Sequence, residues 1–372
     1  MPVFLVGGLA VQISHDLRLS AAELGLAVSV YFGVTALGSL PVGRLVERLG
    51  SARTGRVAVL LAAAAMAAIA LVVHSVPALL GLLAVAATAN SLGQLSSNAS
   101  LAAWVPARRQ GISFGVKQSA IPLSTLLAGA AVPTVALTVG WRWAFAAGAA
   151  LGVAALPLVP PDRPDRPRAH ERRGGRVAAD LALLGVVAAL AAGAANALSA
   201  FLVASSVTRG MAESTAGLLL TAGSAVCVAC RLVVGWLADR WSGAHLGVVA
   251  ALLGLGSVGV GLLGAPGRAW LGVAVLIGFG LGWSWPGLLA FAVVRKHPEA
   301  PAAATSVTQT GVYAGASVGP LGFGLLAVHA GYPVAWLAAA VAIALACGLT
   351  LLAARMGRKD DREGVGPPAS ID

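Results

Sequence analysis

Charged side chains are scarce in this sequence. Asp, Glu, Lys and Arg make up 10% of its 372 residues, where about 25% is usual for soluble domains. At the same time, 58% of the residues are hydrophobic and the mean hydropathy is +0.87. Because a soluble core cannot bury so much apolar surface, the composition excludes a water-soluble globular protein.

Acidic and histidine side chains are missing from the interiors of the apolar segments and fall in loops, tails or segment ends. A membrane-embedded enzyme would need several such groups at one depth, so we expect no catalytic residues, no metal and no cofactor. The three cysteines, Cys227, Cys230 and Cys347, lie inside apolar segments and give no disulfide framework. No internal proton carrier is visible, and Asp16 is one remaining candidate for ion coupling.

Long apolar segments are what the sequence has in abundance. A helix of about 20 apolar residues crosses a hydrocarbon layer about 30 Å thick. Such segments lie at about 2–14, 23–42, 54–74, 77–104, 112–136, 141–159, 178–203, 213–237, 245–264, 269–293, 303–328 and 333–354. The predicted fold class is therefore an all-α polytopic membrane protein with twelve transmembrane helices. The motif SAAE, Ser20 to Glu23, predicts a capping box at the start of the second helix.

A proline-rich and charged stretch divides the twelve segments into two sets of six. We predict an N-terminal six-helix bundle at 1–159, a cytoplasmic linker at 160–177, a C-terminal six-helix bundle at 178–355 and a cytoplasmic tail at 356–372. The first segment is shorter than its counterpart in the second bundle. We therefore expect the first helix to be truncated.

Basic residues are distributed unevenly between the two sides of the predicted membrane. With both termini on one side, that side holds 19 of the 25 Lys and Arg residues. Cytoplasmic loops carry such an excess, so both termini are expected to be cytoplasmic and the protein to lie in the cytoplasmic (inner) cell membrane. The net charge of +11 then reflects topology, and we expect a lipid bilayer rather than a nucleic acid as the partner.

Internal repetition relates the two sets of six helices. The stretch GRLVERLG, from Gly43 to Gly50, recurs as GWLADRWSG from Gly235, and VKQSAIP around Gln118 matches VTQTGVY around Gln309. The halves are therefore expected to be parallel, pseudo-symmetric copies.

The repeated stretch resembles the loop motif of the major facilitator superfamily. Its residues here are Gly43, Leu45, Glu47, Arg48 and Gly50 after the second helix, and Gly235, Leu237, Ala238, Asp239 and Arg240 after the eighth. The resemblance covers essentially the whole chain and implies a transporter that works by alternating access. Glu47 and Asp239 are then candidate gate latches, or simply loop charges that set topology.

Polar residues inside the apolar segments are the candidates for a substrate site or gate, because such residues face the cavity rather than lipid. They are Lys117, Arg231, Gln118, Gln309, Gln94, Asn98 and Asn196, with Tyr31, Tyr313, Trp283 and Trp285 as further candidates. The third, sixth, ninth and twelfth helices contain no Asn, Gln, Lys or Arg in their interiors and are expected to face lipid. In the family these are the outer helices.

The apolar segments contain two cations, Lys117 and Arg231, and no acidic side chain in their interiors. In the family the fifth and eighth helices face each other, so an anionic substrate would relieve the repulsion between the two cations. Alternatively, each cation snorkels to the interface or pairs with a loop carboxylate. We therefore expect a monomeric secondary transporter of a small organic anion, with a drug or metabolite efflux permease of the same superfamily as the alternative. Trp283 and Trp285 line the cavity or pack against lipid.

Overall fold

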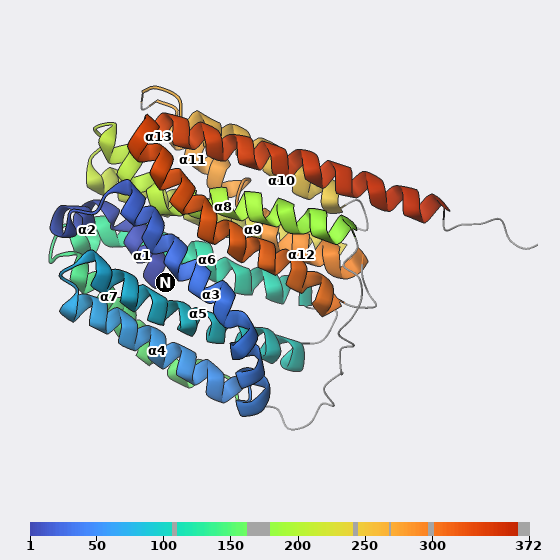
Figure 1. The fold of residues 1–372 in the computed structure, drawn as a ribbon, viewed down its shortest axis with the longest axis horizontal. Helices are drawn as coiled ribbons and strands as arrows, with labels where there is room; N and C mark the ends of the chain where they lie inside the picture. The colour runs from blue at the N-terminus through green and yellow to red at the C-terminus, as the bar shows by residue number, and fades with distance from the viewer. Residues whose placement is uncertain (106–109, 162–178, 241–244, 268, 297–300, 364–372) are drawn as a thin grey trace, which may run out of the picture.

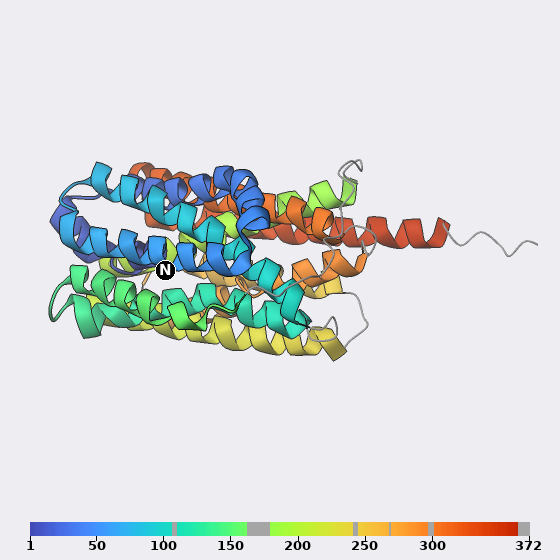
Figure 2. The same cartoon turned by 90° about the horizontal axis from the view of Figure 1, so that it is seen from below.

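The protein is a bundle of long helices that run roughly parallel to its longest axis (Figures 1 and 2). The computed structural model describes residues 1–105, 110–161, 179–240, 245–267, 269–296 and 301–363. The first half comprises α1 (Pro2–Gly8), α2 (Ala10–Leu17), α3 (Ala21–Leu49), α4 (Ser51–Val72), α5 (Val76–Trp104), α6 (Gln110–Ala131) continued by a short π-helix at Val132–Ala136, and α7 (Trp141–Ala154). The second half comprises α8 (Ala179–Thr208), α9 (Glu213–Arg240), α10 (His245–Leu262), α11 (Leu271–Gly280), α12 (Trp285–Lys296) and α13 (Pro301–Glu363). The predicted linker lies almost entirely outside the described residues.

Helix length agrees with a membrane-spanning protein. Within the described ranges, nine helical stretches are long and apolar enough to cross a bilayer. One of them, α13, contains two of the expected spans, which meet at a sharp bend where Gly331 has φ 84°. The pair α1 and α2, and the shorter α7, occupy the places of the first and sixth predicted helices. The architecture is thus consistent with twelve spans.

Two of the twelve predicted spans are interrupted in the structure. The first breaks at Leu9, between α1 and α2. The tenth breaks at Leu281–Ser284, between α11 and α12. Glycine is abundant before this break, and Pro286 in the first turn of α12 has no N–H to continue the hydrogen bonds of α11. The second break leaves backbone carbonyl groups without helical partners in the interior.

The capping box at the start of the second span is confirmed. The Ser20 hydroxyl accepts from the Glu23 backbone N–H, and the Glu23 carboxylate accepts from the Ser20 backbone N–H at 2.8 Å. This reciprocal pair satisfies two N–H groups that the first turn of α3 leaves unpaired.

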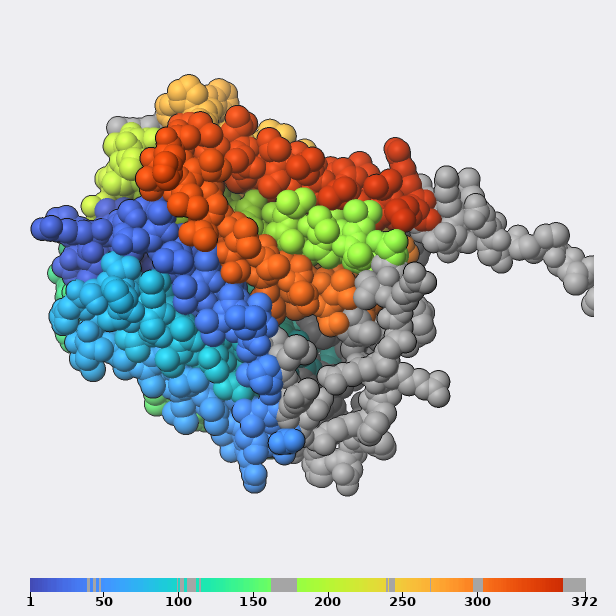
Figure 3. Space-filling view, viewed as in Figure 1, coloured from blue at the N-terminus to red at the C-terminus, as the bar shows by residue number. Residues whose placement is uncertain are grey.

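Large apolar side chains are exposed on the helices that were expected to face lipid. Examples are Leu71 on α4, Trp143 on α7, Leu255 on α10 and Leu337 on the second part of α13, each more than half exposed. These helices pack chiefly against elements of their own half. Between the halves, α3 lies against the first part of α13 (Figures 1 and 3). On another face of the bundle α6 lies against α9.

The halves meet tightly at one end of the molecule, which we call the sealed end. It carries the start of α3 and the turn between α8 and α9, on the left in Figure 1. There Gly25 abuts the backbone of Pro320, and Gly324 abuts the backbone of Ala21. A Cβ atom added to Gly129 would lie 2.5 Å from the carbonyl oxygen of Gly217. Because glycine has no side chain, the two backbones approach as closely as helices can.

The opposite end, which we call the linker end, carries the junction before α8. Contact between α3 and α13 is traceable from Gly25 to Gly33, where an added Cβ would lie 3.1 Å from the Ser317 hydroxyl. One turn further along the same face, Leu37 is 81% exposed. The halves are therefore closed at the sealed end and separate toward the linker end.

Candidate functional site

A pocket lies between the two halves, on the linker-end side of their tight contact. Its empty space, part of which is open solvent, is about 380 Å³. The lining residues are Gly115 and Gln118 of α6, Arg231, Val234, Gly235 and Ala238 of α9, Ser284 at the helix break, and Gly287, Leu288 and Phe291 of α12. Residues from both halves thus build its wall.

Arg231 is the charged group of this pocket wall, and it is 4% exposed. Its Nε and Nη2 atoms donate to the carbonyl oxygen of Trp283 at 3.1 and 2.7 Å, and its Nη1 atom donates to the carbonyl oxygen of Gln118. The Trp283 carbonyl is available because it lies in the break between α11 and α12. Arg231 therefore satisfies an interrupted helix of its own half and bridges to α6 of the other half.

Hydrogen-bonding capacity remains on Arg231. A guanidinium has five N–H groups, and the three described bonds use one on each nitrogen. The Cys227 thiol is a further hydrogen-bond partner of the Arg231 side chain, so one N–H of the five remains for a ligand. The first turn of α12, represented by Gly287 and Leu288, also lines the pocket, and helix N-termini present unpaired N–H groups and partial positive charge. Both features favour a negatively charged ligand.

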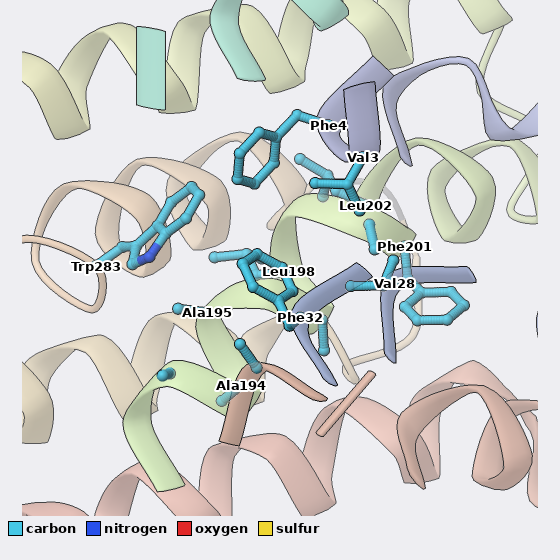
Figure 4. Close-up of a cluster of buried hydrophobic side chains, with 14 of the residues drawn as sticks. Val3, Phe4, Val28, Phe32, Ala194, Ala195, Leu198, Phe201, Leu202 and Trp283 are labelled. Atoms are coloured by element: carbon cyan, nitrogen blue, oxygen red, sulfur yellow. The ribbon is translucent and has the colours of Figure 1, made fainter. Parts of the chain in front are cut away.

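A cluster of aromatic rings lies near Arg231, although its members are not among the residues that line the pocket. Phe4 and Phe32 of the first half converge with Trp283 of the second half, beside Leu198 of α8 (Figure 4). The Phe4 and Trp283 ring centroids are 6.5 Å apart, as are those of Phe4 and Phe32. Arg231 Cζ lies 5.5 Å from the centroid of the Trp283 ring. Trp283 is 4% exposed, so it belongs to the interior and not to the lipid-facing surface.

Lys117 is directed to a different partner. Its ammonium group donates to the side-chain oxygen of Asn98 on α5, which joins two helices of the first half. The structure thus brings together two pairs of predicted residues, Lys117 with Asn98 and Arg231 with Gln118. These pairs share no member, and the hydrogen bonds of Arg231 turn its head inward rather than toward the membrane surface.

Several other predicted residues have local roles in this conformation. Asn196 donates to the Ala192 carbonyl at 2.8 Å within α8. Tyr31 packs edge-on against Phe32. Gln309 and Tyr313 lie one turn apart on α13, and Gln94 is partly buried on α5. Trp285 is 1% exposed, and its indole N–H is without a partner.

The structure describes some residues of the loop motif and not others. Gly235 lines the pocket, Gly50 adopts φ 85° at the junction of α3 and α4, and Arg48 and Arg240 are exposed at their helix ends. The side chains of Glu47 and Asp239, like Gly43, lie outside the described set. Their role as gate latches therefore stays a prediction.

Glu213 was not singled out from the sequence, yet it joins the halves at the sealed end. Its carboxylate accepts a hydrogen bond of 2.6 Å from the Gln12 side-chain amide on α2. Thr125 and Ser224 also bond across the halves, with their hydroxyl oxygens 2.7 Å apart. Glu213 was passed over because it begins a helix, a position where acidic residues are common for local reasons. The sequence feature that pointed to this contact was Gln12, a polar residue inside an apolar segment that needs a hydrogen-bond partner.

Each half contains an ion pair between two of its own helices. Arg142 of α7 pairs with Asp16 of α2 at 2.5 Å, and Trp141 donates to the same carboxylate. These hydrogen bonds lower the pKa of Asp16 below its ordinary value. In the second half, Lys296 of α12 pairs with Asp180 of α8 at 2.6 Å. Within the described residues, no group of three or more His, Cys, Asp or Glu side chains is arranged to hold a metal ion.

Comparison with known proteins agrees with this architecture. The family model described as Major Facilitator Superfamily matches residues 1–204 and again residues 181–371. Two similar solved structures are of a bacterial homolog to the human lysosomal transporter Spinster, in inward-facing unoccupied and inward-facing occupied conformations. Their TM-scores are 0.76 and 0.77 and their sequence identities 16% and 17%, and each alignment covers 96% of this chain and 94% of the other. At this identity the likeness concerns the fold, whereas the family match spans both halves. The chain belongs to the major facilitator superfamily and is a membrane transporter.

Proposed function

We propose that this transporter carries a small organic anion across the cytoplasmic membrane by alternating access. The observation that carries the proposal is Arg231, a buried cation in the wall of an inter-half pocket. Arginine binds carboxylates through two parallel N–H groups. None of the other described lining residues is ionisable, so the pocket carries net positive charge.

The packing of the halves supports the alternating-access part of the proposal. Backbone contacts through Gly25 and Gly129 close the sealed end, while the pocket lies where the halves separate toward the linker end. A transporter of this kind exposes a fixed central site to each side in turn by rocking one half against the other. With the linker in the cytoplasm, as the distribution of basic residues favours, this conformation is open to the cytoplasm.

Uptake in proteoliposomes tests the proposal. Radiolabelled monocarboxylates should accumulate in vesicles that contain the wild-type protein, and Arg231→Lys should reduce uptake by about tenfold or more because lysine keeps the charge but loses the paired N–H groups. Arg209→Lys is the matched control, since Arg209 also donates to backbone carbonyls, those of Leu263 and Ala265, at the sealed end. Unchanged uptake in Arg231→Lys and in the double variant Lys117→Ala, Arg231→Ala would exclude this site.

The second candidate function is efflux of a drug or lipophilic metabolite. The apolar lining residues Val234, Leu288 and Phe291 favour it, with an aromatic cluster nearby, because apolar and aromatic side chains predominate in pockets for lipophilic ligands. A ligand-induced thermal-shift screen that contains both organic anions and lipophilic cations distinguishes the two. Stabilisation by cations alone would favour efflux and contradict the anion assignment.

A further inference from the structure

We propose that the substrate carries one negative charge at one end of a compact apolar body, with its charged end at Arg231 and its body toward Phe291. This inference rests on the proposed function, because it names the class of anion that the same pocket accepts. It is drawn from the balance of charge in the pocket wall, from the hydrogen-bonding capacity that remains there, and from the open space beside three glycines.

Charge balance limits the ligand to one negative charge. Among the described lining residues Arg231 is the single ionisable group, and the first turn of α12 adds only a partial positive charge. One carboxylate is neutralised by this arrangement. A second carboxylate on the same ligand would find no second cation among the described lining residues, since the exposed Arg295 contacts the Phe291 ring without lining the pocket, and an unpaired charge is costly to remove from water.

The remaining capacity for hydrogen bonds is too small for a polar body. The Ser284 hydroxyl already donates to the Gly280 carbonyl and the Gln118 carbonyl already accepts from Arg231, so the Gln118 side-chain amide is the main remaining uncharged polar group among the described lining residues. Val234, Ala238 and Leu288 supply only apolar surface. A ligand rich in hydroxyl groups would lose its hydration here without replacement bonds, whereas an apolar body gains from leaving water.

Phe291 marks the end of the pocket away from the helix break. Its ring centroid lies 5.2 Å from that of His245 in an edge-on arrangement, and 5.6 Å from Cζ of Arg295. Contacts on both sides hold the ring in place, so it offers a fixed apolar surface to the ligand. The charged end of the proposed substrate thus lies at Arg231 and its apolar end at Phe291.

Three glycines give the pocket its width. A Cβ atom added to Gly115, Gly235 or Gly287 would meet no heavy atom within 4 Å, and all three line the pocket. Packing in this conformation therefore does not require glycine at these positions. Gly287, on α12 beside Arg231, is the position where a larger side chain fills the ligand space without disturbing the contact between α6 and α9.

Binding to the purified full-length protein in detergent tests the inference, measured by isothermal titration calorimetry. The probes are benzoate, benzamide, benzene-1,4-dicarboxylate and gluconate, which vary the charge and the polarity of the body one at a time. Benzoate should bind, and each of the other three should bind more weakly by about tenfold or more. Gly287→Leu should abolish benzoate binding. Gly348→Leu, at an exposed glycine of α13 that also has open space around it, should not.

The possible contrary results separate this inference from the proposed function. Equal or tighter binding of the dicarboxylate or of gluconate would overturn the single-charge, apolar-body inference and leave anion transport standing. Benzoate binding that Gly287→Leu does not change would overturn the assignment to this pocket. If no probe bound at millimolar concentration the inference would be wrong, and anion uptake in proteoliposomes would still decide the proposed function on its own.

Discussion

The Gln12 side chain donates a hydrogen bond of 2.6 Å to the carboxylate of Glu213, and the two residues belong to different halves of the transporter. Asp16 and Asp180, by comparison, pair with cations of their own half. Glu213 thus contributes a charge-assisted bond to the sealed end, of a kind worth about 1.5–3 kcal/mol when well formed. Opening of the sealed end must break it.

Removal of this bond is expected to open the sealed end more often. In a background without the native cysteines, Ser224→Cys provides a buried thiol whose labelling rate reports opening, since Ser224 is fully buried. Gln12→Ala and Glu213→Ala should each increase that rate by about tenfold, corresponding to about 1.4 kcal/mol. Glu23→Gln is the control, because the Glu23 carboxylate bonds to Ser20 of its own helix cap. Equal labelling rates in all variants would show that the bond does not hold the halves together.

Side chains added to the glycines of the sealed end should also make that end open more often. A Cβ at Gly129 would lie 2.5 Å from Gly217 O and 2.7 Å from the Thr221 hydroxyl, and such overpacking costs about 1–3 kcal/mol. Gly129→Ala should therefore favour the state in which this end is open and accelerate labelling at Ser224→Cys. Gly81→Ala, at an exposed glycine with free space, should leave it unchanged. Slower labelling in Gly129→Ala would contradict the expectation.

The linker end should show the opposite response. Along the antiparallel contact of α6 and α9, Gly129 faces Gly217, Thr125 faces Ser224, and Gln118 faces Arg231. Continuing this register by one turn brings Gly115 opposite Gly235, where the halves are apart and an added Cβ meets nothing. In alternating access this end must close, so we expect the two glycines to meet then as Gly129 and Gly217 meet now.

Cross-linking measures that closure. Cysteines introduced at Gly115 and Gly235 should be joined by a short bifunctional thiol reagent, and transport should stop when they are. Gly115→Val alone should fold normally and hold the transporter open at the linker end, with transport reduced by about tenfold or more, because a branched side chain prevents the backbone approach. Full transport in Gly115→Val would show that this register does not continue on closure.

The ion pair of Asp16 with Arg142 predicts a pH dependence of stability. Hydrogen bonds from Arg142 and Trp141 lower the pKa of the Asp16 carboxyl from its ordinary 3.8. A lowered pKa stabilises the folded state above the ordinary value, and the contribution disappears as the pH falls through the lowered value. The effect is small, about 1 kcal/mol or less, because the Asp16 side chain is 44% exposed and the pair is screened by solvent.

Thermal unfolding in detergent between pH 7 and pH 3 tests this dependence. The wild-type protein should lose stability below about pH 4, and Asp16→Asn should be less stable at pH 7 but lose less on acidification. Arg18→Gln, at an exposed arginine of the same end, serves as the control. An identical pH profile in wild type and Asp16→Asn would show that the pair contributes nothing.

Features that depend on patterns along the chain could be predicted from the sequence. The length of the apolar segments and the repeat of the Gly43 and Gly235 stretches led to the all-helical fold and to the superfamily, both of which are confirmed. The capping box from Ser20 to Glu23 depends only on neighbouring residues and is also confirmed. Each of these properties is local or periodic, so it can be read without knowledge of tertiary contacts.

Features that depend on backbone groups and on pairing across the halves could not be predicted. Arg231 was a candidate because it is charged, but its partners are the carbonyl groups of Trp283 and Gln118, which carry no side-chain signature. The break before Trp285 was missed because glycine-rich apolar sequence also forms continuous helices in membranes. The pairing of Gln12 with Glu213 joins residues 201 positions apart, beyond the reach of any local pattern.

The bond from Arg231 to residue 118 uses the peptide carbonyl rather than the glutamine side chain. Every amino acid supplies that carbonyl, so position 118 is free to mutate without loosening the bridge between α6 and α9. Gln118 is also one of the residues that line the pocket. Substitutions at position 118 should therefore be able to change which substrate binds without weakening the contact between α6 and α9. Libraries of variants at this position would select for transporters with a different substrate preference.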